Sequence, residues 1–205
     1  PLAAAIALAS APSFAQAPSG GPEQAGALAE VTVTAQRVSE RLQDVPLSVT
    51  ALSAVELQDR QVLTGLDLAR QVPNLYASNN VGLGSASSFF LRGVGQDESL
   101  PTSDPAIGVY VDGVYISRQV ANNVLLYDLD RVEVLRGPQG TLYGRNTSGG
   151  AIKFITRKPE ANFSGYVDTN YEFEYNRYLI DAVVNAPFTD TLYGKLSVVN
   201  TKQQD

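Results

Sequence analysis

The chain has 205 residues, a formal net charge of -6, and neither histidine nor cysteine. The negative charge disfavours binding to nucleic acid and to anionic lipid, since both need a basic surface. Without histidine and cysteine, this chain cannot build a Ser-His-Asp triad, a thiolate nucleophile, or a histidine- or thiolate-ligated metal site. We therefore expect no catalytic residues, no metal site and no cofactor.

Residues 1–15 have the pattern of an export signal. The apolar run Leu2–Ala11 is too short to cross a bilayer, which takes about 20 apolar residues. Small residues flank Phe14, as at a signal-peptidase site. Because the chain opens at Pro1 without a basic region, we expect this signal peptide to be truncated at its start. The alternative is a helix of the protein core.

Residues 16–37 are expected to form a flexible linker, because residues 16–29 are rich in Ala, Gly, Pro and Gln without periodicity. Near its end lies a segment with strand character, in which β-branched residues recur: Glu30, Val31, Thr32, Val33, Thr34 and Ala35. An isolated extended segment can add to the sheet edge of another protein. It can equally be the first strand of the domain that follows, and the residues alone leave both possibilities open.

A small α+β domain is predicted over residues 38–159. Capping boxes that start at Ser53 and Thr64 predict two short helices, the second of which ends at Pro73. The Asp112-Gly113 pair between two β-rich runs predicts a type I′ hairpin, because both turn residues need a positive φ. Further strands are predicted by β-rich runs at residues 46–52, 89–93, 131–137 and 151–156.

The glycine-rich stretch 138–150 does not have the spacing of a phosphate-binding loop. Three residues separate Gly140 from Gly144, and Arg145-Asn146 follows where such a loop has lysine and a hydroxyl residue. We therefore expect tight turns here, packed against a larger part of the protein.

The sequence pattern changes from Phe163 onward. Apolar and polar residues alternate in stretches of about ten residues, with turns at Asn176-Arg177 and at residues 187–190. That length and that period are typical of transmembrane β-strands with one face toward lipid. A soluble antiparallel sheet with one wet face is the alternative.

Several of these motifs together resemble the plug domain of TonB-dependent outer-membrane receptors. The resemblance is carried by Leu91-Arg92-Gly93, by residues 110–115, and above all by residues 131–144 and 146–152. It implies that residues 30–35 are the TonB box, the segment that pairs with TonB as an added strand. It also implies a plug over residues 38–159, lodged inside a barrel.

Residues 160–205 are then expected to be the first antiparallel strands of a large transmembrane β-barrel. A plugged transporter barrel has ~22 strands, and strands of ~9–11 residues would require roughly 200–240 residues. The chain after residue 159 is much shorter than that. We therefore expect the barrel to be incomplete in this sequence.

The function that the resemblance implies is TonB-dependent uptake of a scarce ligand across the outer membrane of a Gram-negative bacterium. A ferric siderophore or a related iron complex is the first expectation. An oligosaccharide or cobalamin is the alternative ligand, and a soluble plug-like module for binding or signalling in the periplasm is the alternative function. The implied partners are TonB, energised by an inner-membrane proton-motive complex, the ligand and outer-membrane lipid, but not nucleic acid.

The resemblance also assigns residues to sites. Arg92 and Arg136 each end an apolar strand beside a glycine, and they are expected to be buried and paired with glutamates of the inner barrel wall. A surface ion pair within the plug is the alternative. Polar side chains at the plug apices that face outside are expected to bind ligand: Asn79, Asn80, Gln96, Asp97, Glu98, Ser117 and Arg118.

Overall fold

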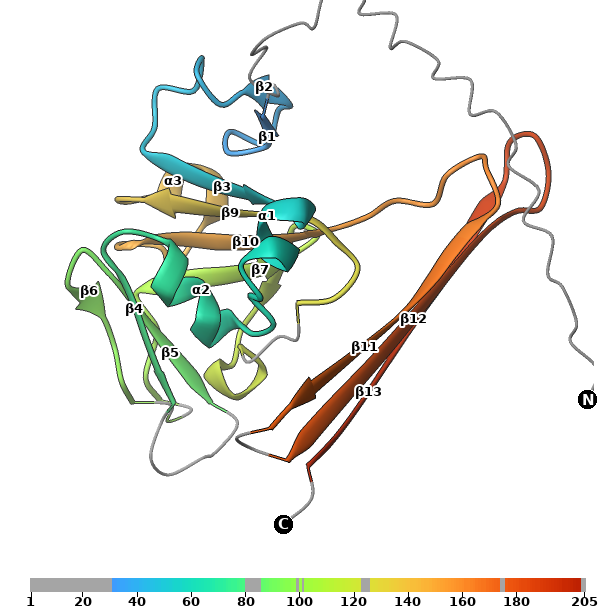
Figure 1. The fold of residues 1–205 in the computed structure, drawn as a ribbon. Coiled ribbons are helices and arrows are strands. Elements are labelled where there is room, and N and C mark those ends of the chain that lie inside the picture. The colour runs from blue at the N-terminus through green and yellow to red at the C-terminus, as the bar shows by residue number, and fades with distance from the viewer. Residues whose placement is uncertain are drawn as a thin grey trace, which may run out of the picture.

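The computed structural model describes residues 31–203 except for 80–85, 99, 101, 123–125, 174 and 175. The expected signal peptide, residues 16–29 of the linker, Glu30 and Asn80 lie outside the described residues. The described chain forms an α+β domain up to about residue 159 and then a separate three-stranded antiparallel sheet (Figure 1). No helix in the described ranges has the length and the apolar character needed to cross a membrane.

A five-stranded sheet forms the centre of the α+β domain, in the order β3-β9-β10-β7-β8. Strands β7 and β10 run parallel, and the other neighbours run antiparallel. The strands of this sheet are β3 (Val49–Ser53), β7 (Ile107–Val111), β8 (Val114–Ile116), β9 (Leu129–Arg136) and β10 (Gly150–Thr156). A smaller sheet beside it consists of β4 (Leu75–Asn79), β5 (Ser87–Leu91) and β6 (Val94–Gly95).

Two short helices, α1 (Ala54–Asp59) and α2 (Gly65–Gln71), lie over the central sheet (Figure 1). Both predicted capping boxes are present: the Ser53 and Thr64 hydroxyls each accept a bond from a backbone amide, and the backbone amides of Ser53 and Thr64 donate to the carboxylates of Glu56 and Asp67. The predicted hairpin between β7 and β8 is confirmed, because Asp112 and Gly113 have φ values of 48° and 83°. A short helix, α3 (Gly140–Tyr143), occupies the glycine-rich stretch in which only turns were expected, and η1 (Gln119–Ala121) is a single 3-10 turn.

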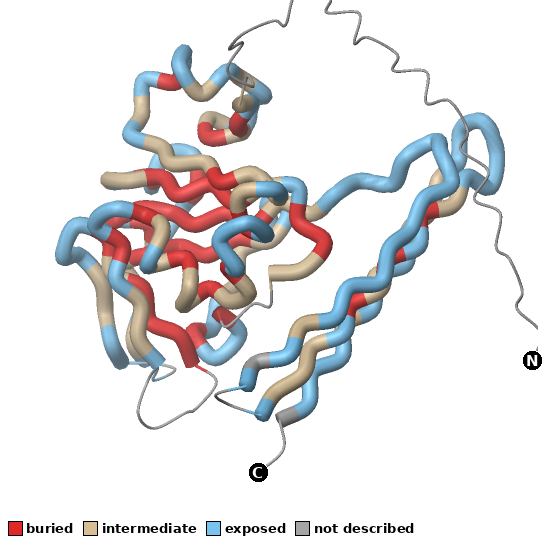
Figure 2. Tube along the Cα trace, in the orientation of Figure 1, coloured by how far each residue is buried: buried red, intermediate tan, exposed pale blue. Residues whose placement is uncertain are grey.

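The central strands of the sheet are buried on both faces (Figure 2). Because strand side chains alternate, Ile152 and Phe154 of β10 point into a large core that also includes Leu57, Leu68 and Phe89. The opposite face has a second, smaller core, whose buried members are Val33, Ala35, Val45, Tyr110, Leu135, Tyr143 and Ala151. This second core contains residues from the segment that precedes the α+β domain in sequence.

The three-stranded sheet consists of β11 (Ser164–Glu172), β12 (Arg177–Pro187) and β13 (Tyr193–Gln203). Most of its apolar side chains face away from the α+β domain and are exposed, among them Val167, Ile180, Val184, Leu196 and Val198, whereas Val183 is buried on the other face. The polar side chains of the other face point toward the α+β domain. The Lys195 ammonium lies 2.7 Å from the Asp128 carboxylate, and Asp181 and Asn185 are buried. The sheet therefore has the two-faced pattern that the sequence predicted.

This two-faced pattern leads to a prediction for the isolated 205-residue chain. In plain buffer it should associate through the exposed apolar face and the open edges of β11 and β13, whereas residues 31–159 alone should stay monomeric. Replacing Leu196 and Val198 together with serine should reduce the association. Sedimentation velocity, with and without detergent, measures this. A monomeric chain with protected amides beyond residue 163 in plain buffer would contradict the assignment of these strands to a membrane.

Candidate functional site

The segment at residues 31–35 is docked on the α+β domain. Strand β1 (Thr32–Val33) pairs antiparallel with β2 (Glu40–Arg41), so that the chain forms a small ribbon of its own beyond β3 (Figure 1). The Val33 and Ala35 side chains are fully buried in the second core. We call residues 31–35 the docked segment. The sequence left open whether this segment pairs with its own domain or with another protein, and in this structure it pairs with its own.

The backbone of the docked segment is bonded to side chains from distant parts of the chain. The Thr34 amide donates to Glu133 Oε1 at 2.7 Å, and the Lys153 ammonium donates to the Thr34 carbonyl at 2.7 Å. The Tyr143 hydroxyl donates to the Ala35 carbonyl at 2.7 Å. Both backbone groups of Thr34 are therefore occupied by side chains of the α+β domain.

Glu133 and Lys153 form a buried ion pair between neighbouring strands. They are direct partners in the β9–β10 register, their charged atoms lie 2.8 Å apart, and their side chains are 0% and 7% exposed. Arg131 Nε also donates to Glu133 Oε1, at 2.8 Å. A buried charge is tolerated when it is paired and hydrogen-bonded, and both conditions hold here.

The surroundings of the ion pair set its ionisation. Burial raises the pKa of Glu133, but hydrogen bonds from Lys153 and from the Thr34 amide lower it more, so that the pKa lies below its ordinary value. Burial lowers the pKa of Lys153, and Glu133 opposes that shift. Burial, followed by the nearby Glu133 charge, raises the pKa of Tyr143 to about 12. Tyr143 therefore keeps the proton that it donates to Ala35, and Glu133 stays an acceptor at neutral pH.

Sequence reasoning missed Glu133, Lys153 and Tyr143, whose side chains bond to the backbone of the docked segment. Glu133 and Lys153 each interrupt an apolar strand, and a lone charge inside such a strand is the signal that could have found them. Tyr143 lies in α3, within the stretch where only turns were expected.

Those residues predicted to bind ligand that the structure describes lie at the end of the domain where β4 ends and β5 begins. This end is far from β1 and β2 in Figure 1. The Gln119 side chain donates to the Gln96 carbonyl at 3.1 Å, which brings Gln96 close to Ser117 and Arg118. Asp97 accepts a bond from Ser78 at 3.1 Å, next to Asn79. Asn79, Glu98, Ser117 and Arg118 are exposed.

A hollow of about 190 Å³ lies at this end of the domain, with Ser117 and Arg118 in its wall. Its other walls include Ser103, Asp104 and Arg145, which the sequence did not single out. The hollow offers two guanidinium groups, a carboxylate and hydroxyl groups to a polar ligand. Among the described residues no three His, Cys, Asp or Glu side chains gather as they would around a metal ion.

Arg92 and Arg136 lie side by side on the surface of the domain. On the described domain Arg92 is exposed and Arg136 is half-buried, and their expected burial against glutamates of a barrel wall stays a prediction. Arg136 donates to the Thr50 hydroxyl at 2.7 Å and Arg92 donates to the Ser48 hydroxyl at 3.2 Å. Burial and the neighbouring Arg92 charge lower the pKa of Arg136. In the described ranges neither guanidinium has a carboxylate partner, so the alternative of an ion pair within the domain is not observed.

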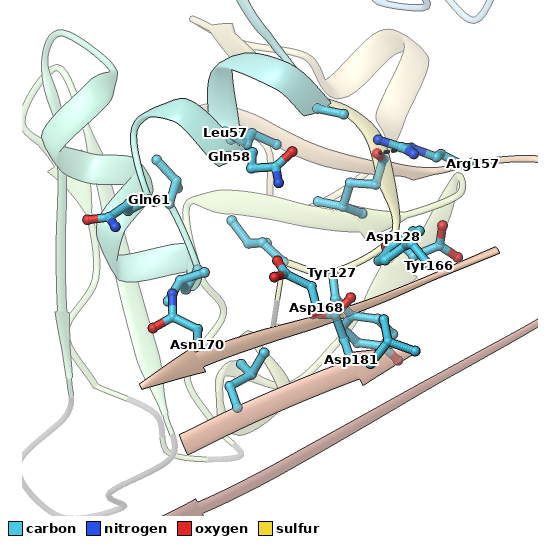
Figure 3. A pocket seen from close by; sticks show the side chains of 17 residues that line it. Leu57, Gln58, Gln61, Tyr127, Asp128, Arg157, Tyr166, Asp168, Asn170 and Asp181 are labelled. Atoms are coloured by element: carbon cyan, nitrogen blue, oxygen red, sulfur yellow. Dashed lines mark hydrogen bonds between the residues drawn. The ribbon is translucent and has the colours of Figure 1, made fainter. Parts of the chain in front are cut away.

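A cavity of about 600 Å³ separates α1 from strands β11 and β12. Figure 3 shows Asp128 and Tyr166 near Asp168 and Asp181 on one side, and Gln58 and Gln61 on the other. Few contacts cross from the three-stranded sheet to the domain; besides the Lys195–Asp128 ion pair, Ser197 bonds to Asp128 and Lys195 to the Arg157 carbonyl. The cavity is thus a space between two parts of the chain, lined by both polar and apolar side chains, rather than a shaped ligand site.

Comparison with known proteins gives consistent matches. The family model described as the TonB-dependent receptor plug domain matches residues 41–151. The pesticin receptor of Yersinia pestis is 34% identical over 179 residues, which cover 82% of this chain and 25% of the receptor. A vitamin B12 transporter of Vibrio vulnificus is 33% identical over 136 residues, or 64% of this chain and 21% of the transporter.

Among solved structures, the ferric yersiniabactin uptake receptor of Yersinia pestis is similar to this chain. The TM-score is 0.67 at 35% identity, with 75% of this chain and 24% of the receptor covered. The chain spans about a quarter of the length of the curated relatives it matches.

The buried ion pair leads to a prediction about stability. Glu133→Leu should destabilise residues 31–159 by about 3–5 kcal/mol, because it leaves the Lys153 ammonium charged, buried and without a carboxylate. Lys153→Met should cost less, because Glu133 keeps its ion pair with Arg131, and the double variant should lose less than Glu133→Leu alone, because the buried Lys153 charge is gone as well. Urea unfolding followed by tyrosine fluorescence gives all three values. Additive losses in the double variant would mean that the two charges are not coupled in the folded domain.

Proposed function

Because this chain belongs to the TonB-dependent receptors, through a plug domain that covers more than half of it, we propose that the complete protein takes up a ferric siderophore. Uptake occurs across the outer membrane of a Gram-negative bacterium and is driven through TonB. The observation that carries this proposal is the likeness to the Yersinia receptor for ferric yersiniabactin. The family consists of receptors and transporters, and the proposal includes no catalytic step.

In this proposal residues 38–159 are the plug and residues 160–205 are the first strands of the surrounding barrel. The outward apolar face and the inward polar face of β11–β13 support that arrangement, since a barrel strand presents one face to lipid and one to the lumen. Arg92 and Arg136 pair with carboxylates of the barrel wall. Their position at the domain surface, without an acidic partner in the described ranges, supports this assignment.

The remaining site assignments concern the two ends of the plug. Residues 30–35 form the TonB box and reach the periplasm, where they add as a strand to TonB. The opposite end binds the ligand through Asn79, Asn80, Gln96, Asp97, Glu98, Ser117 and Arg118. The hollow beside Arg118 supports a polar or anionic ligand, because its two guanidinium groups have no ion-pair partner there among the described residues.

The similarity to a vitamin B12 transporter favours cobalamin as the second candidate ligand. A strain that lacks the complete gene separates the two candidates. Loss of radiolabelled iron uptake from siderophores, with cobalamin uptake unchanged, supports the first proposal. The reverse result favours cobalamin. Uptake that persists without TonB would contradict the proposed function as a whole.

The TonB box assignment predicts the effect of a proline in β1. Val33→Pro removes a backbone amide and should abolish uptake by the complete receptor, because strand addition needs that amide, while ligand binding is retained. The matched control is Val33→Ala, which shortens the same side chain but keeps the amide and should preserve most of the uptake. Normal transport by Val33→Pro would show that this segment does not couple the receptor to TonB.

The ligand-end assignment predicts an effect on affinity. Gln96→Ala and Arg118→Ala should each weaken ligand binding by about tenfold, the loss expected when a hydrogen bond to a charged or polar ligand disappears. Arg70→Ala is the control, because Arg70 is an exposed arginine on α2. Isothermal titration with the purified complete receptor measures the affinities. Unchanged affinity in both variants would place the ligand site wholly in the outer barrel loops.

A further inference from the structure

Backbone groups of the docked segment form hydrogen bonds with side chains of the plug, where the backbone of a strand would form them with a neighbouring strand. The Thr34 amide is bonded to Glu133, and the Thr34 carbonyl is bonded to Lys153. The Ala35 carbonyl is bonded to Tyr143. A segment that adds to the sheet of a partner uses these backbone groups for the inter-strand ladder. The two sets of bonds cannot be made at the same time.

We infer that Glu133, Lys153 and Tyr143 form a clasp that holds residues 31–35 on the plug and keeps them from pairing with a partner strand until the clasp opens. The inference rests on the proposed function in one respect only, the identity of the partner as TonB. The clasp itself is defined by contacts within this chain. Its three residues are positioning residues for the docked segment and touch no ligand.

The location of the clasp explains how it can hold the segment firmly. Glu133 and Lys153 are neighbours on β9 and β10, two inner strands of the central sheet, so their side chains have a rigid base. Among the described strands, the docked segment pairs with β2 alone. Opening therefore moves the segment and leaves the base in place.

The chemistry of the clasp explains how it can open. A buried ion pair with satisfied hydrogen bonds adds little net stability compared with apolar residues of similar size, but it is strongly directional. Glu133 keeps its bonds to Lys153 and Arg131 when Thr34 leaves, so no charge is stranded by the opening. The segment can then depart at the loss of a few hydrogen bonds and of the burial of Val33 and Ala35.

Of the other charged groups near the clasp, Arg131 donates to the Thr34 hydroxyl at 3.5 Å but makes no bond to the backbone of the docked segment. Arg37 lies over the Tyr143 ring, 5.4 Å from its centroid. Asp44 pairs with Arg41 on the exposed side of the ribbon, at 2.6 Å. Asp44 is therefore a suitable control position, because it is a carboxylate close to the docked segment in sequence but outside the clasp.

The test measures how often the docked segment opens in the complete receptor without ligand. The chain has no cysteine, so Val33→Cys, with any cysteine elsewhere in the receptor replaced, reports exposure of the segment through its rate of reaction with a maleimide. Val109→Cys, at a buried position of the large core, reports unfolding of the whole plug. The labelling rate of a buried thiol follows the population of the open form.

The clasp predicts different rates at the two reporters. Glu133→Leu combined with Lys153→Met leaves no charge unpaired, and it should raise labelling at position 33 by about tenfold or more and leave position 109 unchanged. Tyr143→Phe keeps the ring and removes one donor, and it should raise labelling at position 33 by about fivefold. Asp44→Asn should leave both rates unchanged.

Two results would overturn the inference. One is labelling at position 33 that stays slow in both clasp variants. The other is an equal rise at positions 33 and 109, because the segment would then open only together with the whole plug.

Binding of the purified periplasmic domain of TonB separates this inference from the proposed function. Tighter binding by the clasp variants, by about tenfold, supports both. Faster labelling at position 33 without any binding of TonB supports the clasp and contradicts the assignment of residues 30–35 as the TonB box. Loss of uptake in Val33→Pro with slow labelling in both clasp variants supports the proposed function and contradicts the clasp.

Discussion

The arrangement of the plug's second core depends on one buried ion pair, Glu133–Lys153. Charged side chains at the centre of two adjacent apolar strands would destabilise the domain unless each had a partner, and the β9–β10 register supplies it directly. The pair still has bonding capacity to spare, because a carboxylate accepts several hydrogen bonds and an ammonium donates three. The docked segment uses that spare capacity. The same ion pair thus neutralises two buried charges within the sheet and binds the backbone of the docked segment.

Charged and polar side chains also pair with one another at a second interface, between the three-stranded sheet and the plug. Most apolar side chains of the sheet are exposed, and its polar side chains meet the plug through Lys195, Ser197 and Asp128. A membrane barrel must keep a polar lumen, so its plug must also be polar where the two meet. The cavity of about 600 Å³ between them is lined by carboxylates such as Asp128 and Asp181 and also by apolar side chains such as Leu57 and Leu179.

Local signals predicted most of the fold, and distant contacts limited what could be predicted of the site. The caps at Ser53 and Thr64 and the Asp112-Gly113 turn depend on neighbours within a few positions, and all of them are present. The bonds to Thr34 come from residues 99 and 119 positions away, and no local pattern specifies such pairings. Arg92 follows an apolar strand, and the chain turns outward there, with a φ of 53°; the pairing of its guanidinium with a glutamate of the barrel wall stays a prediction. The prediction that Asn79, Gln96 and Ser117 lie at one end of the domain came from the family resemblance and not from any periodicity in the sequence.

The order of strands in the central sheet has a mechanical consequence. Strand β3 is the first strand of this sheet in the chain, it lies at the sheet's edge, and it is bonded only to β9. The ribbon of β1 and β2 lies beyond that edge, so tension applied through it pulls across the strands rather than along them (Figure 1). Hydrogen bonds loaded in this direction break one after another, beginning near Val49, instead of sharing the force. A modest force would therefore peel β3 away from the sheet while β9, β10 and β7 stay paired.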